Sequence, residues 1–570
     1  MAAVAACSSE HRSASSRAAA TGTGGAGGAG LGGMPNTGGS PNTGGITSGG
    51  GAVAGQLGAG GDDDPGAELL PARIRRLASA EYDGSVQALL GTTQAPASGP
   101  DFPPDLRQDG FTVNDAQRVD ALIVERLSDA ADALVTEATA NGTLAKLAPC
   151  SDTDDPTTCA QTFITTFGAK MYRRPLVDDE VSALLTLYNV GADGASYLDG
   201  IGHVTRGLLQ SAGFLYLTEL GDGTAGEGPV NLTNYELAST LSYLLTSAPP
   251  DDELLAKAVS GALADPDERE AEARRLFASD PAAQDTVVRF VREWLGVDGI
   301  VDSAKDSLIY PSFADEKPAI VAESSDFVRA VAFQSTGNVS ELFGANWTVN
   351  TGPLDLYQTA GSGPVPGTTL ITDRVGILNQ AAFLATYANA HESHPVFRGV
   401  AVARRVVCLP LDSPASFDIS VVPPAPDPTM TTRERFDAHV VDPICAGCHD
   451  IIDPFGFSFE HFDGMGAYRA TENGQDVDSS VVVTDKADYD GPYADSNALA
   501  TALAASPTVR ECMARYVYRA SAATGDSAAT PGEPQFVSYW HTIPAAAQGN
   551  IVETLIAYVK GATFGVRNNP

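Results

Sequence analysis

The chain has 570 residues, of which 71 are acidic and 35 are basic, and its formal net charge is −36 at pH 7. This charge argues against nucleic acid and against an anionic membrane surface as partners, because both require a basic protein surface. A chain of this length is too long for a single hydrophobic core, so several packed domains are expected.

The first 64 residues predict a lipoprotein leader followed by a flexible linker. Val4-Ala5-Ala6-Cys7 has the form of a lipoprotein cleavage box, in which Cys7 carries the lipid. Only six residues precede Cys7, so either the match is accidental or translation begins upstream, within a longer signal peptide. Residues 8–64 favour the second alternative, because they are mostly Gly, Ala, Ser, Thr and Asn, the composition of a disordered tether. No run of about 18 apolar residues occurs, so membrane contact is expected only through the lipid anchor.

Helices with recognisable start signals follow in the folded part of the chain. Two capping boxes, Thr233 with Glu236 and Thr431 with Glu434, mark helix starts. Ser506-Pro507 is typical of an N-cap followed by proline at the first helical position. Together with apolar residues at helical spacing, these signals predict helices at 119–135, 233–245, 287–295, 431–439 and 507–517.

Strand signals are few. The segment SSVVVTD at 479–485 is the best strand candidate, and it follows the turn signal Asn473-Gly474, so we expect it to form one arm of a hairpin. Residues 411–429 are rich in proline and predict an extended connector. The chain is therefore expected to be mainly α-helical, with small β-hairpin additions.

The seven cysteines lie at positions 7, 150, 159, 408, 445, 448 and 512. An odd number in an exported protein requires an explanation, which lipidation of Cys7 supplies. Cys150 and Cys159 bracket a short polar loop and predict a local disulfide. Cys408 and Cys512 are left over and would pair if their helices touch; the alternative is that both are buried thiols. This pairing scheme supports an oxidising, exported location.

Residues 445–469 read CAGCHDIIDPFGFSFEHFDGMGAYR and open with Cys-x-x-Cys-His, the attachment signal for covalent haem c. On a helix, Cys445, Cys448 and His449 project from one face, so two sulfurs can bond the haem vinyl groups while the imidazole binds the iron. Two alternatives stay open. The motif could hold zinc with His439 as a further ligand, or it could be a structural disulfide or redox dithiol.

If the motif binds haem, His449 is the expected proximal ligand. Its second ring nitrogen should donate to a backbone carbonyl or a carboxylate, and Asp453 is near enough in sequence to accept. Met465 is the preferred second axial ligand and His439 the alternative; a methionine would raise the reduction potential. The other candidates are His461, Met430 and Met513. Asp453, Glu460, Asp463 and Arg469 are expected to form a salt-bridged cradle and not a catalytic carboxylate pair.

Residues 445–469 resemble the signature of a family of large, secreted, cytochrome-associated proteins that is abundant in planctomycetes and myxobacteria. These proteins are built from five successive domains of unknown function, and the resemblance, which covers Pro71 to Arg567, implies haem binding without naming a substrate. His394 before Pro395 departs from the pattern, where a small hydroxyl residue is expected. Other stretches resemble the remaining domains in the same order, including RRLASAEYDGSVQALLG, FGAKMYRRPLVDDEV, ELASTLSYLLTSAPPDDELL and VRECMARYVYRAS.

The expected fold is a multidomain, mainly α protein with a cytochrome-c-like haem-motif domain behind a disordered Gly-rich tether. The expected units are a leader and linker at 1–64, an N-terminal helical domain at 65–145, a second helical domain containing YRRPL at 146–225, a central helical domain at 226–365, the haem-motif domain at 366–485 and a C-terminal helical domain at 486–570.

The sequence predicts an exported, lipid-anchored protein at the outer membrane, the cell surface or in the periplasm. It would carry covalent haem c and act in electron transfer or haem redox chemistry with a basic redox partner protein. The alternative is a non-enzymatic cell-surface binding or scaffold protein whose Cys-x-x-Cys is a structural disulfide or a zinc site. No P-loop, Rossmann, Gly-x-Ser-x-Gly or His-Glu-x-x-His pattern occurs, so the sequence does not decide whether the protein is an enzyme.

Overall fold

The computed structural model describes residues 69–223, 226–411, 424–425, 427–437, 443–484, 487–523 and 534–569. The predicted lipidation site Cys7, the predicted tether at 8–64, most of the predicted connector at 411–429 and the candidate ligand His439 lie outside the described residues.

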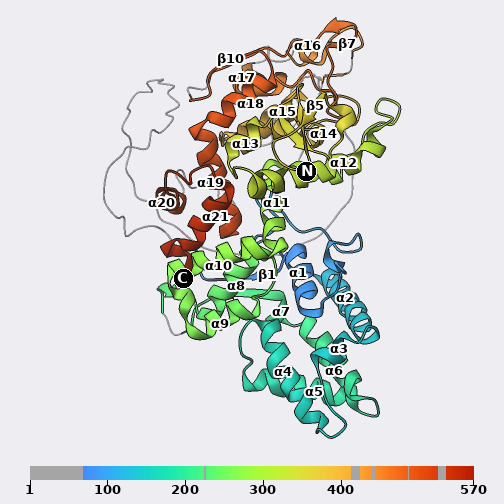
Figure 1. Ribbon diagram of the computed structural model, residues 1–570, viewed down its shortest axis with the longest axis vertical. Helices are drawn as coiled ribbons and strands as arrows, with labels where there is room; N and C mark the ends of the chain where they lie inside the picture. Colours follow the sequence, from blue (N-terminus) through green and yellow to red (C-terminus); the bar gives the residue numbers. More distant parts are fainter. Residues whose placement is uncertain are drawn as a thin grey trace, which may run out of the picture.

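Residues 79–215 form an N-terminal lobe around its own apolar core, at the lower end of Figure 1. The predicted helix at 119–135 is present and extends to Ala140, and the side chain of Asp120 caps its start. The predicted Cys150–Cys159 disulfide is confirmed and closes the loop before the fourth helix. The lobe contains α1 (Ser79–Leu90), α2 (Ala121–Ala140), α3 (Thr143–Leu147), α4 (Pro156–Tyr172), α5 (Asp178–Ala192), α6 (Tyr197–Leu209) and α7 (Ala212–Leu215).

A second, larger core collects residues from Leu232 to Phe564, together with Phe111 from the N-terminal lobe. Its helices fill the centre, the upper end and the left side of Figure 1. They are α8 (Asn234–Thr246), α9 (Asp252–Ser260), α10 (Pro266–Ser279), α11 (Pro281–Leu295), α12 (Phe313–Arg329), α13 (Val339–Gly344), α14 (Ala381–Thr386), α15 (Pro395–Ala401), α16 (Thr432–Asp437), α17 (Pro443–Phe457), α18 (Ser496–Ala505), α19 (Pro507–Ala522), α20 (Pro534–Thr542) and α21 (Ile551–Lys560).

The predicted helix starts are confirmed. Thr233 and Glu236 form the reciprocal capping box of α8, and Thr431 with Glu434 does the same for α16. The Ser506 hydroxyl accepts from the Val509 amide at the start of α19. None of the described helices combines the length and the apolar composition needed to cross a bilayer.

The described strands form five small antiparallel sheets. The strand prediction at 479–485 is confirmed, but its hairpin was assigned to the wrong turn. Asn473-Gly474, with positive φ at both residues as a two-residue hairpin turn requires, joins β7 to β8, whereas β9 pairs with β10. The pairs are β1 (Arg73–Arg76) with β2 (Tyr216–Glu219), β3 (Gly228–Asn231) with β11 (Val566–Asn569), β6 (Thr368–Ile371) with both β4 (Trp347–Val349) and β5 (Thr359–Ser362), β7 (Thr471–Glu472) with β8 (Gln475–Asp476), and β9 (Val481–Val483) with β10 (Gly491–Tyr493).

Two of these sheets bring the first and the last described segments of the chain together. β11 pairs with β3, and a bridge from Asn568 to Pro71 places the last strand beside the first. Glu219 lies between Arg73 (2.9 Å) and Arg567 (2.7 Å), all three largely buried. Burial alone would raise the pKa of Glu219, but the two guanidinium groups outweigh it and hold that pKa well below its ordinary value of 4.5. The strands β1, β2 and β11 are therefore linked by one buried carboxylate.

The prediction of a mainly α fold with small sheets is confirmed. A separate cytochrome-c-like domain is not confirmed, because the aromatic residues of the predicted haem-motif segment pack into the larger core. They contribute Phe455, Phe457, Phe459 and Phe462, each at most 4% exposed.

Candidate functional site

The residues of the Cys-x-x-Cys-His motif lie on consecutive turns of α17. Cys445 and His449 are each 5% exposed, whereas Cys448 is exposed. Neither thiol forms a disulfide in the part of the chain that the structure describes. The alternative of a structural Cys445–Cys448 disulfide therefore receives no support from the structure.

Zinc is the other alternative for these thiols. Among the described residues, a group of three neighbouring metal-ligand side chains occurs only at Cys150, Asp154 and Cys159, and both of those cysteines are consumed by their disulfide. His439, the fourth ligand that the zinc alternative required, lies outside the described residues. The described side chains thus provide no tetrahedral zinc cluster at the motif.

The His449 ring is oriented by a carboxylate one turn further along α17. Its Nδ1 lies 2.8 Å from Oδ1 of Asp453, and both residues are buried. Because a carboxylate accepts hydrogen bonds, Nδ1 is the donor in this contact, and Nε2 is the ring nitrogen that a metal could use. The prediction that Asp453 supplies the acceptor is confirmed. A carboxylate in this position is also typical of histidines that ligate metals.

Two glycines let α17 lie directly against α15. A Cβ atom on Gly399 would stand 2.1 Å from the Ile452 carbonyl oxygen, and one on Gly456 would stand 2.1 Å from that of Pro395. No side chain fits at such a separation, so the two backbones are in contact at this crossing. The crossing fixes the position of the helix that carries His449.

The chain after α17 is held by buried arginines. Arg398, fully buried, donates to the carbonyl oxygens of Phe459, Phe462 and Asp463. Arg469 forms ion pairs with Glu460 at 2.8 Å and with Glu472 at 2.7 Å. The predicted cradle is confirmed for Glu460 and Arg469. The other two carboxylates act locally: Asp453 binds His449, and Asp463 accepts from the amides of Met465 and Ala467.

The structure does not bring Met465 to His449. Met465 is buried in the larger core, with its sulfur 4.0 Å from the Ser312 hydroxyl, and it is absent from the pocket beside His449. Met513 is buried on α19, and His461 stacks on Tyr468. The assignment of Met465 as the second axial ligand stays a sequence prediction.

An open pocket lies beside His449. The centre of a water molecule can occupy about 230 Å³ of it, and it shares residues with a wider groove over β9 and β10. The Arg433 guanidinium lies over the Phe457 ring and pairs with Asp478 at 3.4 Å. The pocket therefore combines the Arg433 guanidinium and three carboxylates with an apolar wall of Phe457, Val481 and Val482. Its lining is Arg433, Asp437, His449, Asp450, Asp453, Pro454, Phe457, Val481 and Val482, so the two thiols lie outside it.

His394, the residue that departs from the family pattern, is the N-cap of α15, a position where a hydroxyl side chain would also serve. Its Nδ1 accepts from the Phe397 amide at the start of α15, and the ring stacks on Phe397 at 3.7 Å. Burial and the nearby Arg398 lower the pKa of His394 to about 3. The ring is therefore neutral at physiological pH and available as a helix cap.

Fold and site together define a mainly helical protein with two disulfides and a Cys-x-x-Cys-His helix. Four family models match it in chain order: PSD3, protein of unknown function (DUF1587), at residues 75–140; PSD5 (DUF1595) at 159–219; PSD4 (DUF1592) at 232–357; and PSCyt3 (DUF1588) at 374–472.

All four models are described as protein of unknown function, and the name PSCyt3 suggests an association with cytochromes. The resemblance predicted from the sequence is confirmed to this extent, whereas the organisation in five domains is not. No curated protein and no solved structure matches the chain.

Proposed function

We propose that this protein is an exported, lipid-anchored c-type haem protein that transfers electrons or uses haem in a redox reaction. The observation that carries the proposal is an imidazole whose Nδ1 is held by Asp453, on the same helix as Cys445 and Cys448. The match of residues 374–472 to PSCyt3 supports it through the cytochrome association in that name.

The start of α17 carries the residue types that attach covalent haem, although the two thiols lie outside the pocket beside His449. Cys445 and Cys448 would form the two thioether links, and Nε2 of His449 would bind the iron. The Phe457 and Val481 side chains of the pocket beside His449 would lie against the ring. The bound haem would supply one-electron redox chemistry. Asp453 makes the imidazole a stronger donor and prevents it from turning.

The proposed export and the proposed basic redox partner rest on the disulfides and on the net charge of the chain. The Cys150–Cys159 and Cys408–Cys512 disulfides support folding in an oxidising compartment, as an exported protein requires. The net charge of −36 supports a basic redox partner, because long-range attraction between opposite charges accelerates association.

Covalent haem should be detectable directly. When the chain is expressed with cytochrome-maturation machinery, the purified protein should show a Soret band and a haem stain that survives denaturing gel electrophoresis. The Cys445→Ser and Cys448→Ser variants should each lose one thioether link, and the double variant should lose the stain. The matched control is Cys150→Ser with Cys159→Ser, which changes two cysteines far from the motif and should stain like wild type. A correctly folded wild-type protein without stain would contradict the proposal.

Asp453→Ala should raise the reduction potential of the haem protein and leave haem attachment intact. The carboxylate increases the basicity of the imidazole and so favours the ferric iron. Asp450→Ala is the control, since Asp450 lies on the same helix and lines the same pocket but makes no hydrogen bond to His449 in the described structure. Spectroelectrochemical titration compares the three proteins, and equal shifts in both variants would assign the effect to charge alone and remove the positioning role of Asp453.

A further inference from the structure

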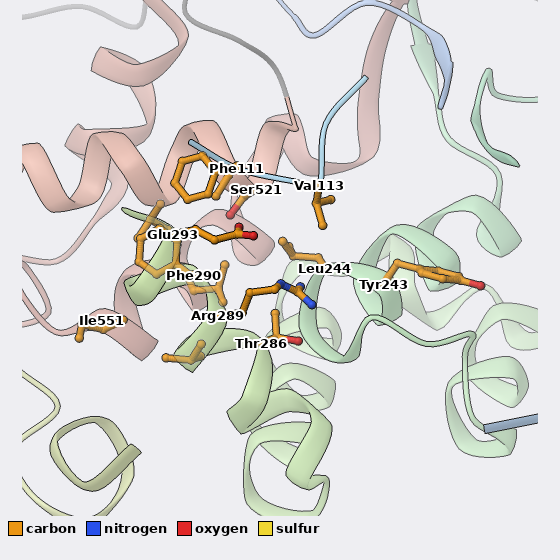
Figure 2. Close-up of a pocket in the computed structure, with 14 residues that line it drawn as sticks. Phe111, Val113, Tyr243, Leu244, Thr286, Arg289, Phe290, Glu293, Ser521 and Ile551 are labelled. Atoms are coloured by element: carbon orange, nitrogen blue, oxygen red, sulfur yellow. The ribbon is translucent and has the colours of Figure 1, made fainter. Parts of the chain in front are cut away.

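A second cavity, remote from α17, lies where the N-terminal lobe meets the larger core. Figure 2 shows it between α8, α11, the end of α19 and the loop that contains Phe111 and Val113. Its walls are mainly apolar, and they are formed by Phe111, Leu244, Phe290, Val517, Ile551 and Leu555. The centre of a water molecule can occupy about 60 Å³ of it, which is room for roughly five waters.

Two charged side chains of opposite sign face this cavity from one helix. Arg289 and Glu293 stand one turn apart on α11, so their side chains share a face. In Figure 2 both reach from α11 in the direction of Leu244. The described residues provide no ion pair for either of them. The cavity therefore presents a cation and an anion side by side, next to an apolar wall.

Each charged group keeps hydrogen-bonding capacity. Arg289 donates through Nη2 to the Ser247 hydroxyl at 2.8 Å, which leaves other N–H groups of its guanidinium. Glu293 is 6% exposed, and its Oε1 accepts from the Thr112 hydroxyl at 2.6 Å. Its Oε2 receives no hydrogen bond from any described residue. Burial raises the pKa of Glu293 even though Arg289 opposes the shift, and a ligand cation placed beside the carboxylate would lower that pKa.

We propose that this cavity binds a free α-amino acid with an apolar side chain. The ligand carboxylate would pair with Arg289 and the ligand ammonium with Glu293, while the side chain would lie against Phe111, Phe290 and Leu244. An α-amino acid carries its two charges on neighbouring atoms and its apolar group on the same carbon, which matches the order of groups around the cavity. The site is independent of haem.

Related ligands fit less well for identifiable reasons. A simple apolar carboxylate leaves Glu293 without a cation and places two acidic groups near each other. An apolar amine leaves Arg289 unpaired in a partly desolvated site. In a desolvated site, a charged group without a hydrogen-bonding partner lowers the binding free energy by more than the ligand's apolar contacts contribute. Selectivity for the complete amino acid is therefore the property that distinguishes this proposal from simple filling of a hydrophobic gap.

Isothermal titration calorimetry on the purified full-length protein tests the proposal with L-leucine, L-phenylalanine, 4-methylpentanoate and 3-methylbutylamine. At least one amino acid should bind at one site per chain. The last two compounds are leucine without its ammonium and without its carboxylate, and each should bind about tenfold to a hundredfold more weakly than leucine. No binding of either amino acid, or equal affinity for leucine and its two analogues, would overturn the proposal.

Variants locate the binding. Arg289→Gln and Glu293→Gln should each weaken amino acid binding by about tenfold or more, whereas Asp285→Asn, a charge change on the exposed face of the same helix, should leave it unchanged. Ala520→Phe places a ring in the cavity from α19 and should abolish binding while the circular dichroism spectrum stays that of wild type. Undiminished binding in a folded Ala520→Phe protein would place the ligand elsewhere and refute the assignment.

Discussion

Replacement of Cys408 and Cys512 by alanine is expected to lower the free energy of unfolding by about 4–5 kcal/mol in the chain-entropy description of disulfides. The two cysteines are 104 residues apart in the sequence, so the disulfide closes a long loop in the unfolded chain. Within the fold it joins the chain just after α15 to α19. All three tryptophans, Trp294, Trp347 and Trp540, lie in or against the larger core, so urea unfolding followed by tryptophan fluorescence reports on this change.

The local disulfide provides the control for loop length. Cys150 and Cys159 are separated by 9 residues, and their replacement by alanine should cost only about 2–3 kcal/mol by the same relation. Because that pair lies in the N-terminal lobe, the fluorescence midpoint of the larger core should change little. Equal effects of the two double variants on the larger core, or free Cys408 and Cys512 thiols in non-reducing peptide mapping, would contradict the prediction.

The features of the site that could be predicted from the sequence are the local ones. Cys445, Cys448, His449 and Asp453 share one helix, so their spacing alone determines that they lie together. Met465 follows only 16 residues after His449, but Gly464 and Gly466 lie against Tyr310 and Ala381 and place Met465 in the core. Beyond the end of α17, closeness in sequence to His449 therefore did not predict closeness in space.

Contacts between segments far apart in the chain could not be predicted from the sequence in this way. Capping boxes predicted where α8 and α16 begin, because those hydrogen bonds link residues three apart. The pairing of β3 with β11 joins segments more than 330 residues apart, and short strands of ordinary composition do not indicate such a partner. Arg289 and Glu293 likewise look like polar positions of an amphipathic helix; only the approach of Phe111 from the N-terminal lobe encloses them.

Glu219→Gln is expected to destabilise the protein by about 3–5 kcal/mol at neutral pH, as when one partner of a buried ion pair is removed. The substitution leaves Arg73 and Arg567 beside each other with no anion between them, and these residues join the first and last strands. Glu553→Gln is the matched control, since Glu553 also pairs with an arginine, Arg274, but both side chains are at least 36% exposed. An exposed pair contributes about 0–1 kcal/mol.

The dependence on pH tests the cause of the Glu219 effect. Arg73 and Arg567 hold the pKa of Glu219 below its unfolded value of 4.5, so the stabilisation is fully present above that pH. It decreases as the pH falls below 4.5, because the unfolded chain then binds a proton that the folded protein resists. The difference in unfolding free energy between wild type and Glu219→Gln should therefore be constant from pH 7 to about pH 5.5 and decrease steadily below pH 4.5. Subtracting the unfolding free energy of Glu219→Gln from that of wild type removes the contribution of the other carboxylates, because they titrate equally in both proteins. A difference that stays constant down to the acid-unfolding limit would show that Glu219 acts by packing alone, and that its charge does not hold the first and last described strands together.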